Sequence, residues 1–142
     1  MKKLIYRMTG LLALAILAAP HVARAQEKVV VDIPFAFSVG KLTLPPGEYS
    51  VQRTDGPFLL IQRTDGSALA TVLSIATQAN EIQSESKLVF HRYGDRYFLS
   101  QVWRAGYGTG RELPKSSREK ELALIARHKA PDEIMIVARL TP

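Results

Sequence analysis

The sequence predicts a mainly β fold: a small antiparallel barrel or sandwich of about seven strands, with one helix in the C-terminal region. Three patterns favour this class. Apolar residues alternate along residues 29–39, one five-residue segment ending in Asp-Gly occurs twice within residues 52–66, and a helix-capping pattern begins at Ser116. Many short strands separated by turn residues, with a single late helix, are typical of small barrels and sandwiches.

The first predicted strand covers residues 29–39. Successive side chains of a strand point to opposite faces, so apolar residues at every second position predict one buried face. Pro34 has no amide hydrogen for a sheet ladder, which places this strand at an edge or breaks it there. Gly40 ends it. The alternating apolar residues are Val29, Val31, Ile33, Phe35, Phe37 and Val39.

A tandem repeat predicts the next strands. Gln-Arg-Thr-Asp-Gly stands at residues 52–56 and again at 62–66. Asp-Gly between β-prone segments is a strong signal for a tight hairpin, in which both central residues take positive φ. We therefore expect a meander followed by a polar, exposed loop. The predicted strands are 48–53, 58–63 and 67–75, and the loop is 76–86.

A second hairpin is predicted at residues 87–104, with its turn at Tyr93-Gly94-Asp95. Its return strand is apolar on both faces, as is usual for a central strand that is covered on both sides. Strict alternation assigns Tyr97, Leu99 and Trp103 to one face, and Phe98 and Val102 to the other.

One helix, at about residues 115–129, is predicted to cover this strand. Ser116 and Glu119 match a capping box, in which both side chains bind backbone amides of the first turn. Leu122, Ile125 and Ala126 follow at helical spacing, and Pro131 ends the helix. A final strand is expected at about residues 133–140.

The first 25 residues predict export. Lys2, Lys3 and Arg7 precede an apolar segment at 11–19, and Ala23-Arg24-Ala25 is a small-x-small cleavage site. The apolar segment is short of the roughly 20 residues that span a bilayer. We expect cleavage after Ala25, a periplasmic or secreted location and no membrane span after cleavage. The rest, residues 26–142, is expected to be a single β-rich domain.

Composition excludes several classes of function. The formal net charge is +6, but residues 1–25 hold four of the 19 Lys and Arg and no acidic residue. The remainder, with 15 basic and 13 acidic residues, is an ordinary soluble surface, so we expect no nucleic-acid partner. The chain has no cysteine, which excludes a disulfide scaffold, thiol catalysis and Cys-ligated metal.

Sequence motifs do not indicate catalysis. The glycines at 106, 108 and 110 lack the Lys-Ser/Thr of a phosphate loop, and residues 112–114 separate them from the helix. Two histidines beyond residue 25, His91 and His128, are too few for a zinc site. A triad of Ser100 with His91 and Asp95 would lack a nucleophile elbow. We expect no enzymatic activity, no metal and no cofactor.

The richest cluster is aromatic and basic. Six of the ten aromatic residues beyond residue 25 fall within residues 90–107, interleaved with basic residues. Such a cluster suits a surface that binds a ligand or partner through stacked rings and arginine clamps. It equally suits a sheet in which the rings form the core and the arginines are solvated. The candidate patch comprises His91, Arg92, Tyr93, Tyr97, Trp103, Arg104 and Arg111.

Four segments resemble a family of small, uncharacterised exported β-rich proteins from acidobacterial-type soil bacteria. They are Ile-Pro-Phe-x-Phe-x-Val-Gly at 33–40, Leu-Pro-x-Gly-Glu-Tyr at 44–49, residues 87–99 and residues 110–114. The resemblance covers most of residues 29–127. It implies an exported β-rich domain, and because the family has no known activity it transfers no catalytic role.

Two functions fit these observations. The first is a non-catalytic envelope or secreted domain that acts by contact with an envelope protein, a glycan or a surface, through exposed edge strands. The alternative is a lipocalin-like carrier of a small apolar ligand, with a cavity lined by residues such as Phe90, Tyr97 and Trp103.

Overall fold

The computed structural model describes residues 28–127 and 129–141, so the predicted export signal and its cleavage site lie outside the described residues. The mainly β class, the single helix and the final strand are confirmed, but the strands number eleven over the described residues rather than about seven. In chain order the elements are β1 (Lys28–Ile33), β2 (Phe37–Val39), β3 (Leu42–Leu44), β4 (Gly47–Arg53), β5 (Phe58–Arg63), β6 (Leu69–Leu73), β7 (Ile75–Gln78), β8 (Ser86–Tyr93), β9 (Arg96–Trp103), β10 (Thr109–Glu112), α2 (Ser117–Ala126) and β11 (Asp132–Thr141).

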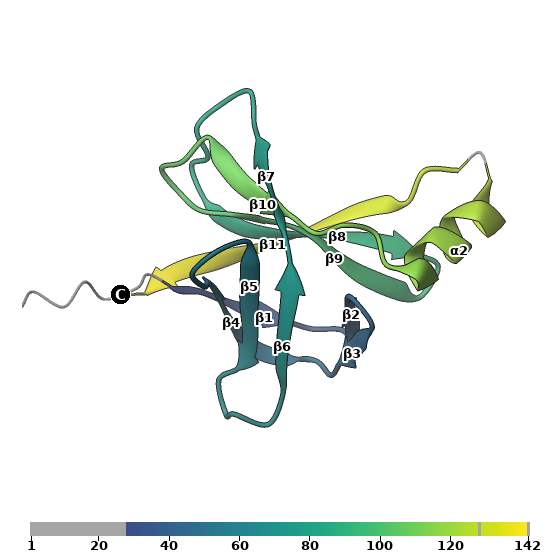
Figure 1. Ribbon diagram of the computed structural model, residues 1–142, viewed down its shortest axis with the longest axis horizontal. Helices are drawn as coiled ribbons and strands as arrows, with labels where there is room; N and C mark the ends of the chain where they lie inside the picture. Colours follow the sequence, from purple (N-terminus) through teal and green to yellow (C-terminus); the bar gives the residue numbers. More distant parts are fainter. Residues whose placement is uncertain (1–27, 128, 142) are drawn as a thin grey trace, which may run out of the picture.

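The strands form one strongly curled sheet in the order β3-β2-β9-β8-β11-β1-β4-β5-β6, with β7 and β10 branching from β9. Neighbours are antiparallel except β2 and β9, which pair in parallel. The sheet curls into a nearly closed barrel (Figure 1). At the closure, a Cβ on Gly40 after β2 would lie 3.7 Å from Cγ2 of Val72 in β6. The architecture is therefore a barrel, not a sandwich.

The barrel interior is aliphatic and aromatic. Phe37 makes edge-to-face contacts with Tyr49 at 5.1 Å and with Phe90 at 5.5 Å between ring centroids. The Tyr49 hydroxyl donates a hydrogen bond to the carbonyl of Pro45, so this buried phenol is satisfied. The predicted buried face of residues 29–39 lies in this core, and the strand breaks at residues 34–36, as Pro34 predicts.

Both repeat copies form hairpins, as predicted, but their turn type is not the predicted one. Gly56 and Gly66 have positive φ, 102° and 80°. Among the described residues other than glycine, only Arg127 has positive φ, so the aspartate of each Asp-Gly pair does not. The Asp-Gly pairs therefore do not form two-residue turns with positive φ at both positions. Longer loops are closed by Thr54 N–H to the Phe58 carbonyl, 3.0 Å, and by Arg63 N–H to the Ala68 carbonyl, 2.9 Å.

A bulge changes which residues of β9 face the core. Phe90 of β8 pairs with Leu99, but Val89 pairs with Gln101, so Ser100 is an extra residue in β9. The extra residue reverses the alternation, and Leu99 and Val102 both join the barrel core. The predicted grouping of Trp103 with Tyr97 and Leu99 is wrong for this reason.

The helix α2 is shorter than the predicted 115–129, and its cap forms only in part as predicted. The Ser116 hydroxyl accepts a hydrogen bond from Glu119 N–H at 3.2 Å, which confirms the N-cap. The Glu119 side chain instead turns toward the sheet, where it is the buried residue of the helix. No helix formed by the described residues is long and apolar enough to cross a membrane.

Candidate functional site

The seven residues of the candidate patch lie at two opposite ends of the β8–β9 ribbon (Figure 1). One group lies at the turn between β8 and β9, beside α2; this is the turn end. The other group lies at the opposite end, beside β10. The residues expected to line a carrier cavity are packed within the fold: Phe90 lies in the core and Tyr97 stacks on Phe35 at 3.8 Å. Trp103 lies beyond the bulge from both. The turn-end group is His91, Arg92, Tyr93 and Tyr97; the β10 group is Trp103, Arg104 and Arg111.

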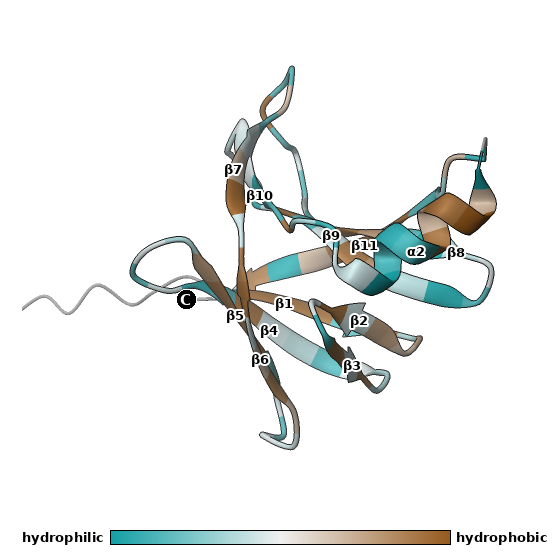
Figure 2. Cartoon of the chain, turned by 45° about the vertical axis from the view of Figure 1, so that its right-hand side comes forward, coloured by the Kyte–Doolittle hydropathy of each residue, from teal (hydrophilic) through white to brown (hydrophobic). Residues whose placement is uncertain are grey.

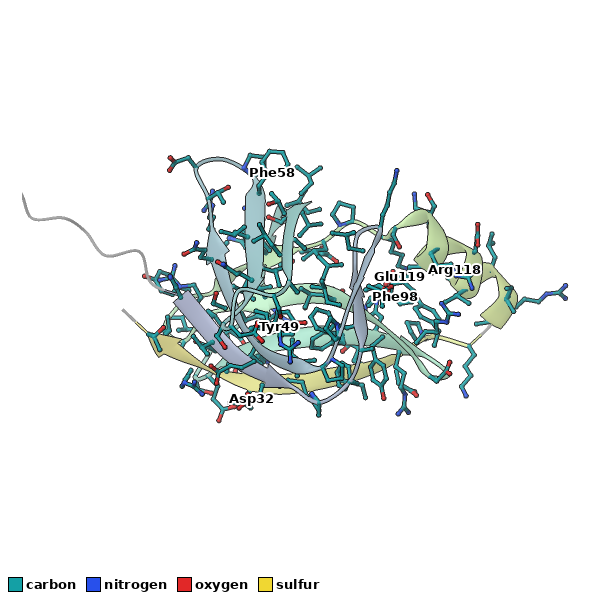
Figure 3. All side chains as sticks on the ribbon, turned by 90° about the horizontal axis from the view of Figure 1, so that it is seen from below. Asp32, Tyr49, Phe58, Phe98, Arg118 and Glu119 are labelled. Atoms are coloured by element: carbon teal, nitrogen blue, oxygen red, sulfur yellow. The ribbon has the colours of Figure 1, made fainter. Side chains whose placement is uncertain are left out.

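At the turn end, α2 places a carboxylate against the outer face of the sheet. Glu119 is 3% exposed, and its Oε1 lies 3.5 Å from Nδ1 of His91. Its Oε2 and the hydroxyl of Tyr93 are both buried without a hydrogen-bond partner among the described residues. Figure 3 shows Glu119 beside Phe98, whereas Arg118 lies on the outer side of the helix. Polar atoms are therefore enclosed here without being fully paired.

Two residues of this group have shifted pKa values, and burial is the main cause only for Tyr93. Burial raises the pKa of Tyr93 above its ordinary value, and the charge of Glu119 raises it further. Arg92 has its pKa raised by its hydrogen bond to Asp132, 2.7 Å, and by a second one to Tyr97. Each shift follows from a structural contact, and neither prepares a proton donor or acceptor near neutral pH.

The turn-end group does not assemble into the triad weighed from the sequence. His91 faces Glu119, while Asp95 is exposed in the turn and Ser100 is buried at the bulge. The described residues also contain no cluster of three or more His, Cys, Asp or Glu side chains that could hold a metal ion. The contact between His91 and Glu119 lies where α2 meets the sheet.

At the other end, a pocket of about 510 Å³ opens at the mouth of the barrel. This volume is typical of sites that hold small organic molecules. Its apolar wall comes from four strands of the barrel: Val29, Val51, Leu59 and Val102. Its cationic part comes from three arginines: Arg53, Arg104 and Arg111. None of the described residues that line the pocket is acidic.

Arg111 is held in place before any ligand arrives. Its Nε donates to Oγ of Ser74 at 2.9 Å, and its Nη2 donates to the carbonyl of Ser74 at 2.7 Å. The Ser74 hydroxyl in turn donates to the carbonyl of Pro57 at 2.8 Å. Burial lowers the pKa of Arg111, and the nearby charge of Arg53 lowers it further. The pocket therefore concentrates positive charge in a partly dry site.

Arg104 and Trp103 complete this end. The Arg104 guanidinium lies 4.6 Å from the centre of the Tyr107 ring, a cation–π contact. Trp103 lies against Gly110, where a Cβ would be 2.6 Å from Cε3 of the indole. Trp103 therefore fixes β10 against β9, and this sets the position of Arg111 on the pocket rim.

Several residues of both ends were missed by sequence reasoning. Arg53 lies in the tandem repeat, but nothing distinguishes it there from Arg63, which lies against Gly47 instead. Ser74 was placed in a strand, and Glu119 was taken as a capping residue. The signal that could have suggested Glu119 is its place on the inward stripe of the helix, with Leu122 and Ala126 at i+3 and i+7.

Comparison of the chain with protein-family models, with curated proteins and with solved structures finds no match in any of the three. The resemblance to exported soil-bacterial proteins therefore stays a prediction.

Proposed function

We propose that this chain is a non-catalytic binding domain, exported to the periplasm or the exterior, that holds a small amphipathic anion in the barrel-mouth pocket. The observation that carries the proposal is the pairing of an apolar wall with three arginines and no lining carboxylate among the described residues. An apolar wall favours a hydrocarbon or aromatic body, and the arginines favour a carboxylate, sulfonate or phosphate head. Export is the part that depends on the predicted signal.

The electrostatics of the pocket support an anionic rather than a neutral ligand. Burial and the charge of Arg53 both disfavour the charged form of Arg111. A bound anion would offset both effects, since it supplies opposite charge where solvent is partly excluded. Arg111 already has hydrogen bonds to Ser74, so it loses little side-chain freedom when it meets such a ligand.

The test compares three probes of equal chain length: dodecanoate, dodecanol and dodecylammonium. We expect dodecanoate to bind and the cationic probe not to bind, as measured by calorimetry. Arg104→Gln and Arg53→Gln are each expected to raise the Kd of dodecanoate about 10- to 100-fold, since each removes a hydrogen bond to a charged group. Arg111 is left unchanged because it also joins β10 to Ser74.

The matched control is Arg96→Gln, which removes the same charge from the exposed, turn end of β9. It is expected to leave the Kd unchanged. Equal affinity for dodecanol and dodecanoate would show that the arginines do not select the ligand. Native mass spectrometry of the exported protein provides a second measurement, because a ligand acquired in the cell adds mass that disappears on denaturation.

The second candidate is the contact function expected from the sequence, and one observation favours it. The strand β6 ends the sheet path, and its neighbourhood exposes Phe58, Leu69 and Leu73. An exposed edge with apolar side chains can accept an extended segment of a partner protein as an added strand. A Leu69→Lys/Leu73→Lys variant should then lose a crosslinked envelope partner that the unaltered protein retains, while still binding dodecanoate.

A further inference from the structure

The helix α2 presents two of its apolar side chains, Leu124 and Ile125, away from the protein. Leu124 and Ile125 are 75% and 76% exposed, the highest values among the large exposed apolar residues. The inward stripe of the helix is instead made by Glu119, which is buried, and by half-buried Leu122 and Ala126. The C-terminal half of α2 is the brown part of the helix in Figure 2. Packing against the barrel therefore does not explain why Leu124 and Ile125 are apolar.

Basic side chains outnumber acidic ones along the same segment of the chain. Among the described residues from 115 to 129, the exposed charges are Lys115, Arg118, Lys120, Arg127 and Lys129 against Glu121 alone. Glu121 is paired with Arg118 at 3.2 Å, and Glu119 is buried beside His91. The elements packed next to the helix add Asp95 and Arg96 of the turn, Asp132, which Arg92 binds, and Glu133. The local surface keeps a surplus of positive charge.

A cleft lies directly behind this part of the helix. It has a volume of about 240 Å³ and lies between α2 and the ends of β8 and β11. Its walls are mainly apolar, with Leu122, Ile125 and Ala130 among the lining residues. Its charged lining residues are Lys129, Arg92 and Asp132, and the last two pair with each other, so Lys129 supplies the surplus positive charge. An apolar cleft with adjacent cations matches the chemistry of a lipid at the boundary of acyl chains and phosphates.

We propose that the α2 tip, defined as Leu124, Ile125, Arg127 and Lys129, docks on an anionic lipid surface. Leu124 and Ile125 enter the acyl boundary, and Arg127 and Lys129 contact lipid phosphates. Charge complementarity selects this occupant over a protein. A stable protein interface needs about 800 Å² on each partner and a core depleted of charge, whereas the α2 tip has two apolar side chains next to two basic ones. The proposal is independent of the ligand in the barrel-mouth pocket.

The test uses the exported protein and two kinds of vesicle: pure phosphatidylcholine, and phosphatidylcholine with one third phosphatidylglycerol. We expect binding to the anionic vesicles that weakens at high salt, and little binding to the neutral ones. Leu124→Ser/Ile125→Ser and Arg127→Gln/Lys129→Gln are each expected to weaken binding about tenfold or more. The control is Leu69→Ser/Leu73→Ser, which removes two exposed apolar residues from β6 and should bind as the unaltered protein does.

A second readout reports insertion directly. Because the chain has no cysteine, Ile125→Cys carries a single environment-sensitive dye, and Leu73→Cys carries the same dye at β6. We expect a blue shift on anionic vesicles at position 125 and none at position 73. Equal shifts at both positions, no vesicle binding, or undiminished binding by the two α2 variants would overturn the proposal. Loss of a protein partner by the α2 variants, without vesicle binding, would do the same.

Discussion

The barrel interior and the face under α2 differ in one respect: the face under α2 buries an ionisable carboxyl group, whereas the barrel interior does not. The barrel encloses aromatic and aliphatic groups, and its one buried phenol, Tyr49, has a hydrogen-bond acceptor. The α2 face encloses the carboxylate of Glu119 beside His91, while Leu124 and Ile125 remain exposed. Sites that break local rules of burial are the usual places for function, so the comparison separates an apolar core that stabilises the fold from a face whose burial pattern the core does not explain.

The largest expected difference is in core truncation. Phe90→Ala should lower the free energy of unfolding by about 3–5 kcal/mol, because it empties a fully buried site in edge-to-face contact with Phe35 and Phe37. Leu124→Ala on α2 should change it by no more than about 0.5 kcal/mol. Urea denaturation measures both. A large loss from Leu124→Ala would mean that α2 is buried against something in solution, and the comparison would fail.

The next largest effect concerns the buried carboxyl group of Glu119. His91→Leu replaces the polar neighbour of Glu119 and should cost about 1–3 kcal/mol of unfolding free energy, because the buried carboxyl group then faces an apolar side chain. Glu119→Leu should be close to neutral or stabilising. In the double variant the cost of His91→Leu should largely disappear, which a double-mutant cycle measures. Additive single effects would show that the two side chains do not interact.

Two glycines near the pocket offer a matched pair. Gly110→Ala places a Cβ 2.6 Å from the Trp103 ring and 2.8 Å from the Val102 carbonyl, so it should cost about 1–3 kcal/mol and move the emission of the only tryptophan. Gly108→Ala meets no atom within 4 Å and should stay within about 0.5 kcal/mol. Equal stabilities would mean that β10 is not held against β9 by Trp103.

The contrast between the two regions also marks what the sequence can predict. The buried face of residues 29–39, the two hairpins and the Ser116 cap depend on neighbours a few residues away, and all were predicted. The bulge at Ser100 depends on the register with β8, and it decided which way Trp103 faces. The strands β7 and β10 were missed because each pairs with the other across more than 30 residues. A polar loop and a glycine-rich segment give no local sign of that pairing.

The candidate patch shows the same limit. Composition located the aromatic and basic cluster, but only the ribbon geometry divides it between α2 and the barrel mouth. Arg53 reaches the pocket from β4, about 50 residues before Arg104 and Arg111. The burial of Glu119 depends on where α2 lies on the sheet. Such long-range placement cannot be obtained from the spacing of residues within one segment.

The smallest expected effects come from two tyrosines, one in each region. Tyr49→Phe should cost about 0.5–1.5 kcal/mol, because its hydroxyl is bonded to Pro45, whereas Tyr93→Phe removes an unpartnered buried hydroxyl and should be neutral or stabilising at pH 7.

Unfolding measurements at alkaline pH on the same two variants compare Tyr49 with Tyr93 more sharply. Burial raises the pKa of both phenols, so the unfolded chain loses these protons first. The two protonated phenols therefore contribute fully to the free energy of unfolding below about pH 10, and this contribution declines as the pH rises further. Each phenylalanine variant should flatten that decline, as measured by the unfolding midpoint between pH 9 and 11, roughly one unit either side of the ordinary tyrosine pKa. Because Glu119 adds its charge only at Tyr93, Glu119→Gln should flatten the decline in the unaltered protein and not in Tyr93→Phe. An identical response to Glu119→Gln in both backgrounds would show that the carboxylate and the phenol are not coupled, and that the α2 face titrates no differently from the barrel.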